Sequence, residues 1–209
     1  MFVITADQID SRNDHDRARE MMERLVTQNP SAFSLPPDQT AGDEIQLLVA
    51  TAQPTLDAIL ALHRSGHWSV GLGIGTVRTP LPASTRQATG PAFIAAREAG
   101  LRAKKTEAHF ALESAQTNTA APGIEALVTL LLLLRQRRTP QGWEAADLFE
   151  GGLAQTDMAD KLGISTGAVS QRLKAAQYRV EQAARPALVR LLEQLDVAPN
   201  DGTNEKEPA

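Results

Sequence analysis

Carboxylates at two places in the N-terminal part of the sequence could together bind a metal ion. Asp7 follows a short apolar run, and Asp43 and Glu44 stand at the tip of an expected β-hairpin. In a β-α-β-β order of elements, the first strand and the hairpin can lie side by side, which would bring Asp7 and Asp43 together. Two adjacent carboxylates suit a Mg²⁺ or Mn²⁺ ion that holds nucleotide phosphates, although acidic residues are also common at strand ends and turns.

Residues 155–174 fit a helix-turn-helix, in which two short helices cross at a tight turn. Ala159 is small enough to let the helices approach closely, and Gly163 can adopt a positive φ at the turn. The candidate N-caps are Gln155 or Thr156 for the first helix and Ser165 for the second. Five apolar residues are expected to form the small core between the helices: Met158, Leu162, Ile164, Val169 and Leu173.

The outward face of the second of these helices is predicted to contact double-stranded DNA. Short polar side chains and an amide can read base edges in the major groove, and cations can bind phosphates. The residues with these properties are Ser165, Thr166, Ser170, Gln171, Arg172 and Lys174. The run 166–168 has no large base-reading side chain, and a plain helical hairpin or a protein-docking module would show the same spacing.

The remaining basic residues and histidines are expected to be ordinary surface groups. Arg135, Arg137 and Arg138 are interpreted as the solvated end of a helix rather than as a phosphate clamp. The histidines lack the arrangement of metal ligands, because a helix end separates one pair and the others have no partner nearby. They are His15, His63, His67 and His109.

Strands and helices must alternate in the first part of the chain to position the carboxylates. The spacing of apolar residues predicts these elements. They are a strand over 2–6, a helix over 14–28, a hairpin over 33–49, a helix over 54–64, a glycine-rich strand over 68–77, a helix over 91–102 and a strand over 109–113. This order predicts an α+β fold.

A polar stretch of small residues, 116–123, is the expected linker to a helical domain. Beyond it we expect helices over 124–137 and 140–150, the helix-turn-helix, and a long helix to about residue 195 that Pro186 should kink or restart. The expected units are therefore a mixed domain over 1–115, a DNA-binding domain over 124–196 and a disordered acidic tail over 197–209.

Composition and charge exclude several kinds of site. The absence of cysteine excludes disulfides, thiolate metal sites and cysteine nucleophiles. Residues 135–190 hold 9 basic and 6 acidic side chains in a chain of net charge −4, and this modest excess favours a dimer on DNA. The N-terminus lacks the features of a signal peptide and the apolar run 130–134 is too short to span a bilayer, so we expect a cytoplasmic protein without membrane contact.

Three segments resemble the palm-type catalytic domain shared by class III nucleotidyl cyclases and by diguanylate cyclases with their GGDEF hairpin. Residues 41–45, Ala-Gly-Asp-Glu-Ile, follow Asp7 as that hairpin would. Residues 68–77 are similar to the glycine-rich strand after the second cyclase helix, and residues 90–97 to the next loop and helix. With the C-terminal helix-turn-helix, the order of elements over 2–185 looks most like the SatD family. The resemblance implies a ferredoxin-like, palm-type N-terminal domain.

By this resemblance, Asp7 and Asp43 would hold Mg²⁺ or Mn²⁺ together with a nucleotide. The ligand-binding positions would be Asp7, Gly42, Asp43, Glu44, Gly73, Gly75 and Arg97. The sequence departs from the cyclase pattern, because Gln39 stands at the lysine that selects adenine and Ile94 at an asparagine of the following helix. A cyclase must also stabilise charge on the transferred phosphate, so binding without turnover is the expected use of the domain.

Two functions follow from these patterns. The first is a transcriptional regulator that binds DNA as a homodimer and senses a nucleotide or another small molecule through its cyclase-like domain. The second is a metal-dependent nucleotidyl cyclase or nucleotidyltransferase regulated by the helix-turn-helix. A protein-interaction module is a third interpretation.

Overall fold

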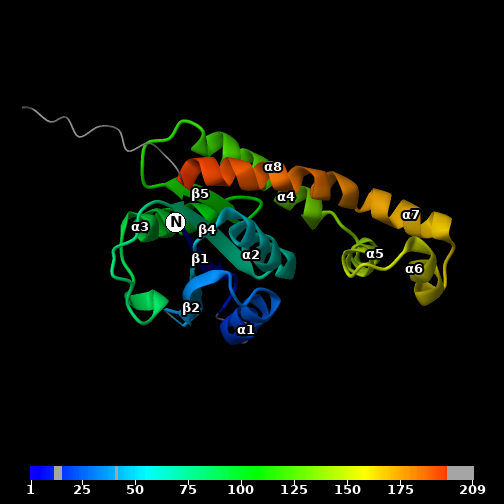
Figure 1. Cartoon of the computed structure of the whole chain (residues 1–209), viewed down its shortest axis with the longest axis horizontal. Coiled ribbons are helices and arrows are strands. Elements are labelled where there is room, and N and C mark those ends of the chain that lie inside the picture. The colour runs from blue at the N-terminus through cyan, green and yellow to red at the C-terminus, as the bar shows by residue number, and fades with distance from the viewer. Residues whose placement is uncertain (12–15, 41, 197–209) are drawn as a thin grey trace, which may run out of the picture.

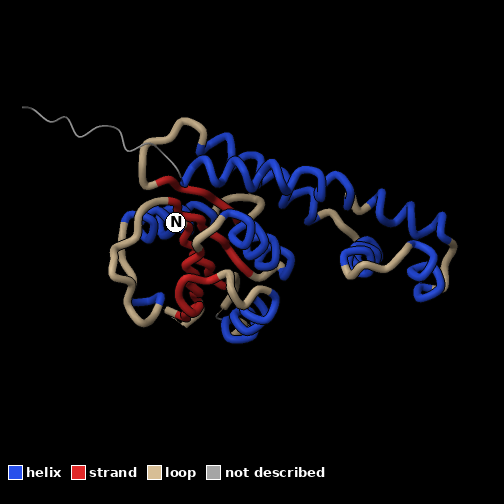
Figure 2. The backbone as a smooth tube through the Cα atoms, viewed as in Figure 1, coloured by secondary structure: helices blue, strands red, loops and turns tan. Residues whose placement is uncertain are grey.

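The computed structural model describes residues 1–11, 16–40 and 42–196. Within these ranges the chain is α+β, with a five-stranded mixed sheet and eight α-helices (Figure 1). The strands gather at one end of an elongated molecule, and only helices occupy the other end (Figure 2). His15, Ala41 and the expected acidic tail over 197–209 lie outside the described residues.

The sheet places the first strand at its centre. Its strands are β1 (Phe2–Gln8), β2 (Phe33–Gln39), β3 (Glu44–Val49), β4 (Trp68–Ile74) and β5 (Phe110–Ser114), in the order β2-β3-β1-β4-β5. Strands β1 to β4 pair antiparallel, and β5 pairs parallel with β4. The predicted strands and hairpin are thus confirmed, and β1 lies between β3 and β4.

Helices cover both faces of the sheet. Helices α1 (Ala18–Gln28) and α2 (Ala52–Ser65) pack on one face, where Ile4 is in the main hydrophobic core. Helix α3 (Pro91–Ala103) packs on the other face, where the neighbouring Val3 contacts it. Successive residues of a strand point to opposite faces, so β1 is apolar on both sides.

Glycines of β4 let α3 lie directly against the sheet. A Cβ atom at Gly71 would lie 2.2 Å from the backbone nitrogen of Gly100, and one at Gly73 would lie 2.2 Å from the carbonyl oxygen of Ala92. A non-glycine residue at either position would push the helix away. A short 3₁₀ helix, η1 (Thr85–Gln87), precedes α3 in the connecting loop.

The C-terminal helices are shared between two hydrophobic cores. They are α4 (Ala121–Gln136), α5 (Pro140–Glu150), α6 (Gln155–Leu162), α7 (Thr166–Ala175) and α8 (Tyr178–Asp196). Helix α4 and the end of α8 bury apolar side chains in the main core beside the sheet, whereas α5, α6 and α7 form a separate small core with Tyr178. Helix α8 therefore connects both units, and α4 lies beside it (Figure 1).

The packing does not follow the expected division at residues 116–123. Helix α4 begins inside that stretch, and its residues Ile124, Val128 and Leu132 belong to the core of the sheet domain. The physical reason is that the apolar stripe of α4 needs a cover, which α2, β5 and α8 supply. No helix within the described ranges is long and apolar enough to cross a lipid bilayer.

Helix α8 runs through Pro186, so of the two expected effects, a kink or a restart, the helix does not restart there. Pro186 is exposed, so water can solvate the carbonyl group that the proline leaves without a donor. The helical path is instead interrupted at Gln177, between α7 and α8, where the backbone adopts a φ of 51°.

Candidate functional site

The segment over 155–174 folds as two short helices joined by a tight turn. Gly163 has a φ of 65°, and the Ile164 N–H donates to the carbonyl oxygen of Ala159 at 3.1 Å. The Ser165 hydroxyl oxygen caps α7 by accepting from the Ala168 N–H at 3.2 Å. The expected turn and second cap are confirmed. The expected cap at Gln155 or Thr156 is wrong, because Ala154 is the N-cap of α6 and has no acceptor.

A third helix completes the core of this unit. Met158, Val169 and Leu173 are buried as expected, and Leu162 and Ile164 are partly buried against them. Ala145 and Ala146 of α5 belong to the same core. The unit is therefore a three-helix bundle whose first helix the sequence pattern did not include.

The expected DNA-reading side chains lie on one exposed surface of α7. We define the α7 face as Ser165, Thr166, Ser170, Gln171 and Lys174, all exposed. Lys174 forms no ion pair within the described ranges. Arg172 differs, because its Nη1 atom pairs with a carboxylate oxygen of Glu144 on α5 at 3.0 Å. Arg172 thus holds α7 against α5.

Three further polar residues border the α7 face. Gln155, Gln177 and Arg179 line a hollow of about 190 Å³ together with Ser170 and Lys174. Arg179 is exposed and adds a second cation beside Lys174. The left-handed turn at Gln177 brings Arg179 to this surface, and the sequence offered no sign of that turn.

The hairpin carboxylates lie next to the end of β1, as expected. Asp7 is directly opposite Glu44 in the antiparallel register, so their side chains share one face of the sheet. The backbone N–H of Gln8 donates to the carbonyl oxygen of Asp43 at 3.0 Å. Asp43 directly precedes β3 and is therefore next to the Asp7–Glu44 pair.

Each of these carboxylates already has a partner. Lys104 at the end of α3 pairs its Nζ atom with Asp7 Oδ2 at 2.8 Å. The Ser11 hydroxyl donates to Asp43 Oδ2 at 2.5 Å. Thr40 and Gln46 donate to Glu44 Oε1 at 2.5 and 3.2 Å.

These residues do not fit a prepared Mg²⁺ or Mn²⁺ site. The ammonium group of Lys104 neutralises Asp7 at the position where a cation would bind. A hard divalent ion prefers several oxygen ligands, and no group of three or more His, Cys, Asp or Glu side chains placed to hold a metal ion occurs in the described parts of the chain. In this structure Asp7 pairs with Lys104 and Asp43 accepts from Ser11, so each carboxylate has its own partner.

The glycines expected at the ligand have other roles. Gly73 lies under α3, and a Cβ atom at Gly75 would lie 2.7 Å from the Cβ atom of Ala115. No ligand can occupy the space that the backbone of α3 fills at Gly73. Gly42 has a φ of 63° at the hairpin tip and faces open space. A glycine is therefore favoured there by the backbone conformation of the turn and not by close packing.

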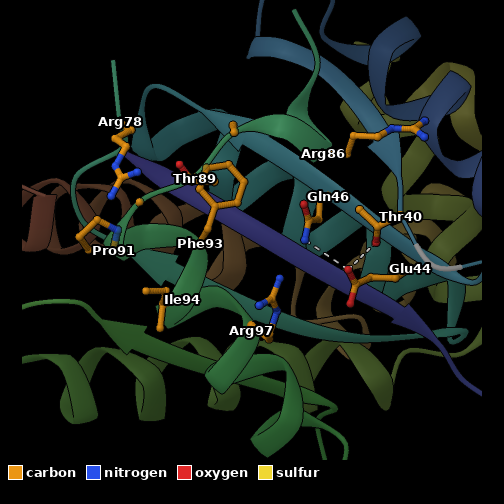
Figure 3. A pocket seen from close by; sticks show the side chains of 12 residues that line it. Thr40, Glu44, Gln46, Arg78, Arg86, Thr89, Pro91, Phe93, Ile94 and Arg97 are labelled. Atoms are coloured by element: carbon orange, nitrogen blue, oxygen red, sulfur yellow. Dashed lines mark hydrogen bonds between the residues drawn. The ribbon is translucent and has the colours of Figure 1, made fainter. Parts of the chain in front are cut away.

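A large open pocket lies between β3 and the start of α3. This sheet pocket has a volume of about 930 Å³. Its lining residues are Thr40, Glu44, Gln46, Arg78, Arg86, Ala88, Thr89, Gly90, Pro91, Phe93, Ile94 and Arg97. Figure 3 shows Arg78 at one end beside Pro91, and Glu44 with its two hydrogen-bond donors toward the other end.

The arginines of the sheet pocket differ in their partners. Arg86 donates two hydrogen bonds to Asp38, at 2.8 and 2.6 Å, and these bonds hold the pKa of that carboxyl below its usual value. Arg78 and Arg97 are exposed and form no ion pair within the described ranges. The pocket can therefore bind an anion at two guanidinium groups and a hydroxyl or amine at Glu44.

No protein-family model, curated protein or solved structure matches this chain.

The arginines at the C-terminal end of α4 are not all the solvated helix end expected from sequence. Arg137 is exposed, but Arg135 and Arg138 are buried and share the carboxylate of Glu181 on α8. Trp143 of α5 packs against both guanidinium groups, with ring centroids 4.8 and 4.3 Å from their Cζ atoms. The partners come from distant parts of the sequence, so local charge could not reveal them.

The same tryptophan also contacts the sheet domain. Arg64 at the end of α2 lies 4.1 Å from the Trp143 ring centroid and makes two hydrogen bonds of 2.7 Å to Asp147 of α5. Burial lowers the pKa of Arg135 to about 10, even though Glu181 opposes that shift. A charged, tightly paired joint thus connects the sheet domain to the helix-turn-helix unit.

Proposed function

We propose that the chain is a DNA-binding transcriptional regulator that acts as a homodimer and senses a small anionic ligand through its sheet domain. The observation that carries the proposal is the α7 face: an exposed polar helix surface on a capped helix-turn-helix, held away from the sheet by α8. An α-helix of this kind fits the major groove with its N-terminal residues at base edges.

The DNA contacts divide by chemistry. Thr166, Ser170 and Gln171 offer hydroxyl and amide groups to base edges, and Lys174 and Arg179 offer cations to phosphates. Few cations remain free for DNA, because Arg135, Arg138 and Arg172 are bound to carboxylates. A single copy would therefore bind weakly, and two copies on half-sites about one helical turn apart would bind specifically.

The sheet domain supports a ligand-sensing role. The antiparallel strand order β4-β1-β3-β2 is that of a ferredoxin-like unit, which agrees with the palm-type domain and the SatD family that the motifs resemble. The sheet pocket is within the size range of small-molecule sites. Arg78 and Arg97 suit the phosphate groups of a nucleotide bound without a metal ion.

The DNA experiment selects bound fragments from sheared genomic DNA and compares their affinities by a gel-shift assay. The full chain should enrich one palindromic site. The double substitution Gln171→Ala/Lys174→Ala should weaken binding by tenfold or more, on the order of one base-reading and one phosphate contact. Lys105→Ala is the control, because it removes an exposed charge next to α3. DNA binding without preference for one site would overturn the proposed regulator function. So would binding that Gln171→Ala/Lys174→Ala retains in full.

One observation favours an enzyme as the alternative function. Asp7 and Glu44 face each other beside a nucleotide-sized pocket, as carboxylates of a metal-dependent nucleotidyl cyclase or nucleotidyltransferase would. Lys104 would have to leave Asp7 before a metal ion could bind. Product from a nucleoside triphosphate with Mg²⁺ or Mn²⁺, lost in Asp7→Asn, would establish this alternative. If the chain is a regulator without turnover, no product should form from any nucleoside triphosphate.

A further inference from the structure

A second cavity lies at the joint between the sheet domain and the helix-turn-helix unit. This junction pocket has a volume of about 330 Å³. Its walls include His63 of α2, Trp68 of β4, His109 before β5, Arg135 of α4 and Trp143 of α5. It is separate from the sheet pocket, which lies against the opposite face of the sheet beside α3.

Two buried N–H groups of the residues that line this pocket have no acceptor. Trp68 is 2% exposed and Arg135 is 7% exposed. The Trp68 Nε1 and Arg135 Nε atoms make no hydrogen bond to any residue that the structure describes. A buried donor without an acceptor is destabilising and rare in folded proteins, and both of these donors belong to side chains that line one cavity, so the cavity is a candidate site for an acceptor.

The charge around the pocket indicates that this acceptor is anionic. Arg135 and Arg138 share the single carboxylate of Glu181, so these three buried groups carry a net positive charge. Arg64, which also lines the pocket, is neutralised by Asp147. Glu107 is the carboxylate among the lining residues, and it is exposed.

The two histidines provide further donors and acceptors. Burial, followed by electrostatic interactions with Arg135 and His109, lowers the pKa of His63 to about 4, so its imidazole is neutral at pH 7. His109 has a φ of 48°, a conformation that non-glycine residues adopt infrequently, and its Nδ1 atom lies 3.4 Å from the Ser69 hydroxyl. The neutral imidazole of His63 can hydrogen-bond to a ligand without adding charge.

We propose that the junction pocket binds a small molecule that carries a carboxylate or phosphate group. The oxyanion accepts from Trp68 and Arg135 after a small adjustment of the side chains around them, and the rest of the ligand contacts Trp143 and the imidazoles. The ligand would contact α2 and β4 of the sheet domain and α5 of the helix-turn-helix unit at once. Its binding would therefore stabilise one arrangement of the two units.

The tryptophans allow a direct test, because the chain has two and both line the pocket. Their indole N–H signals are followed by ¹H–¹⁵N NMR of the full chain during titration with inorganic phosphate or succinate, with sodium chloride at matched ionic strength as the reference. The Trp68 signal should shift in a saturable manner with one of the two probes. A saturable shift with phosphate alone would identify a phosphate ligand, and a saturable shift with succinate alone would identify a carboxylate ligand.

Three variants locate the binding. Trp68→Phe removes the N–H and should weaken binding by about tenfold, with Trp143 as the remaining reporter. His63→Leu, at a half-buried position, should also weaken binding and serves if Trp68→Phe does not fold. Arg78→Gln/Arg97→Gln alters only the sheet pocket and should leave the titration unchanged.

Two results would overturn the proposal. One is the absence of a saturable shift with either probe, which would mean that the pocket holds water alone. The other is a shift that Arg78→Gln/Arg97→Gln abolishes and Trp68→Phe leaves intact. Neither result depends on DNA binding, so this inference and the regulator proposed above fail separately.

Discussion

Two pairs of arginines in this chain have opposite surroundings. Arg78 and Arg97 are exposed beside the sheet pocket and lack a carboxylate partner in the described ranges, whereas Arg135 and Arg138 are buried and bound to Glu181. The comparison teaches that an arginine indicates an anionic ligand when its charge is uncompensated and reachable. A buried arginine paired with a carboxylate also stabilises the fold, because its charge had to be compensated for the chain to fold.

The largest expected effect tests the buried pair. Glu181→Gln leaves two guanidinium groups in the interior without their counter-charge, and it should reduce the free energy of unfolding by about 3–5 kcal/mol. Urea denaturation measures this loss. Glu193→Gln, an exposed position on the same helix, is the control and should change stability by no more than about 0.5 kcal/mol. Equal stability of both variants would show that Glu181 does not hold the joint together.

The next effect concerns the pH dependence of stability at His63, which lies beside the buried arginine Arg135. Because the pKa of His63 is lowered to about 4 from its usual 6.5, the unfolded chain takes up a proton between these values that the folded chain does not. Stability should therefore fall as pH falls from 6.5 toward 4 and this contribution should then level off. NMR titration of the imidazole gives the midpoint directly. His63→Gln should remove this part of the pH dependence, and a midpoint near 6.5 would contradict the burial.

A third effect tests the exposed pair. Arg78→Gln and Arg97→Gln should each leave the free energy of unfolding within about 0.5 kcal/mol of the parent, because neither side chain holds other groups in place. Each should weaken ATP binding by about tenfold, measured by calorimetry in EDTA. ATP binding that requires Mg²⁺ would contradict this role of the exposed arginines, since the carboxylates would then be the main contacts.

The smallest effect concerns the third arginine of the sheet pocket. Because Arg86 lowers the pKa of Asp38, the stabilisation from this pair is complete above the ordinary value of 3.8 and is lost as pH falls through the lowered pKa. Arg86→Gln should move the carboxyl titration of Asp38 back toward 3.8 in an NMR experiment. The Arg86 side chain is largely exposed, so the change at neutral pH should be small. An unchanged titration would rule out the pairing.

Sequence patterns predicted most of the local structure. The glycine turn at Gly163, the cap at Ser165 and the core residues of the helix-turn-helix were predicted from residue types at short spacing, and the structure confirms them. The order of strands and helices was predicted in the same way. These features depend on neighbouring residues, so a short window of sequence contains the physical information that decides them.

Such local patterns could not predict which residues pair with the charged side chains. The structure pairs Lys104 with Asp7, Glu144 with Arg172, and Glu181 with both Arg135 and Arg138. Each contact gives a residue a structural partner that the sequence pattern did not predict. The strands and helices bring these groups together from positions that are distant in the chain.

Local patterns in the sequence were enough to predict most helices, strands and turns, the turn at Gln177 excepted, because the spacing of apolar residues and the freedom of glycine act over short distances. Only the tertiary structure decided which charges stay free to meet a ligand or DNA. A charge is neutralised by whatever group lies within a few ångströms of it, and those neighbours are set by packing rather than by sequence distance.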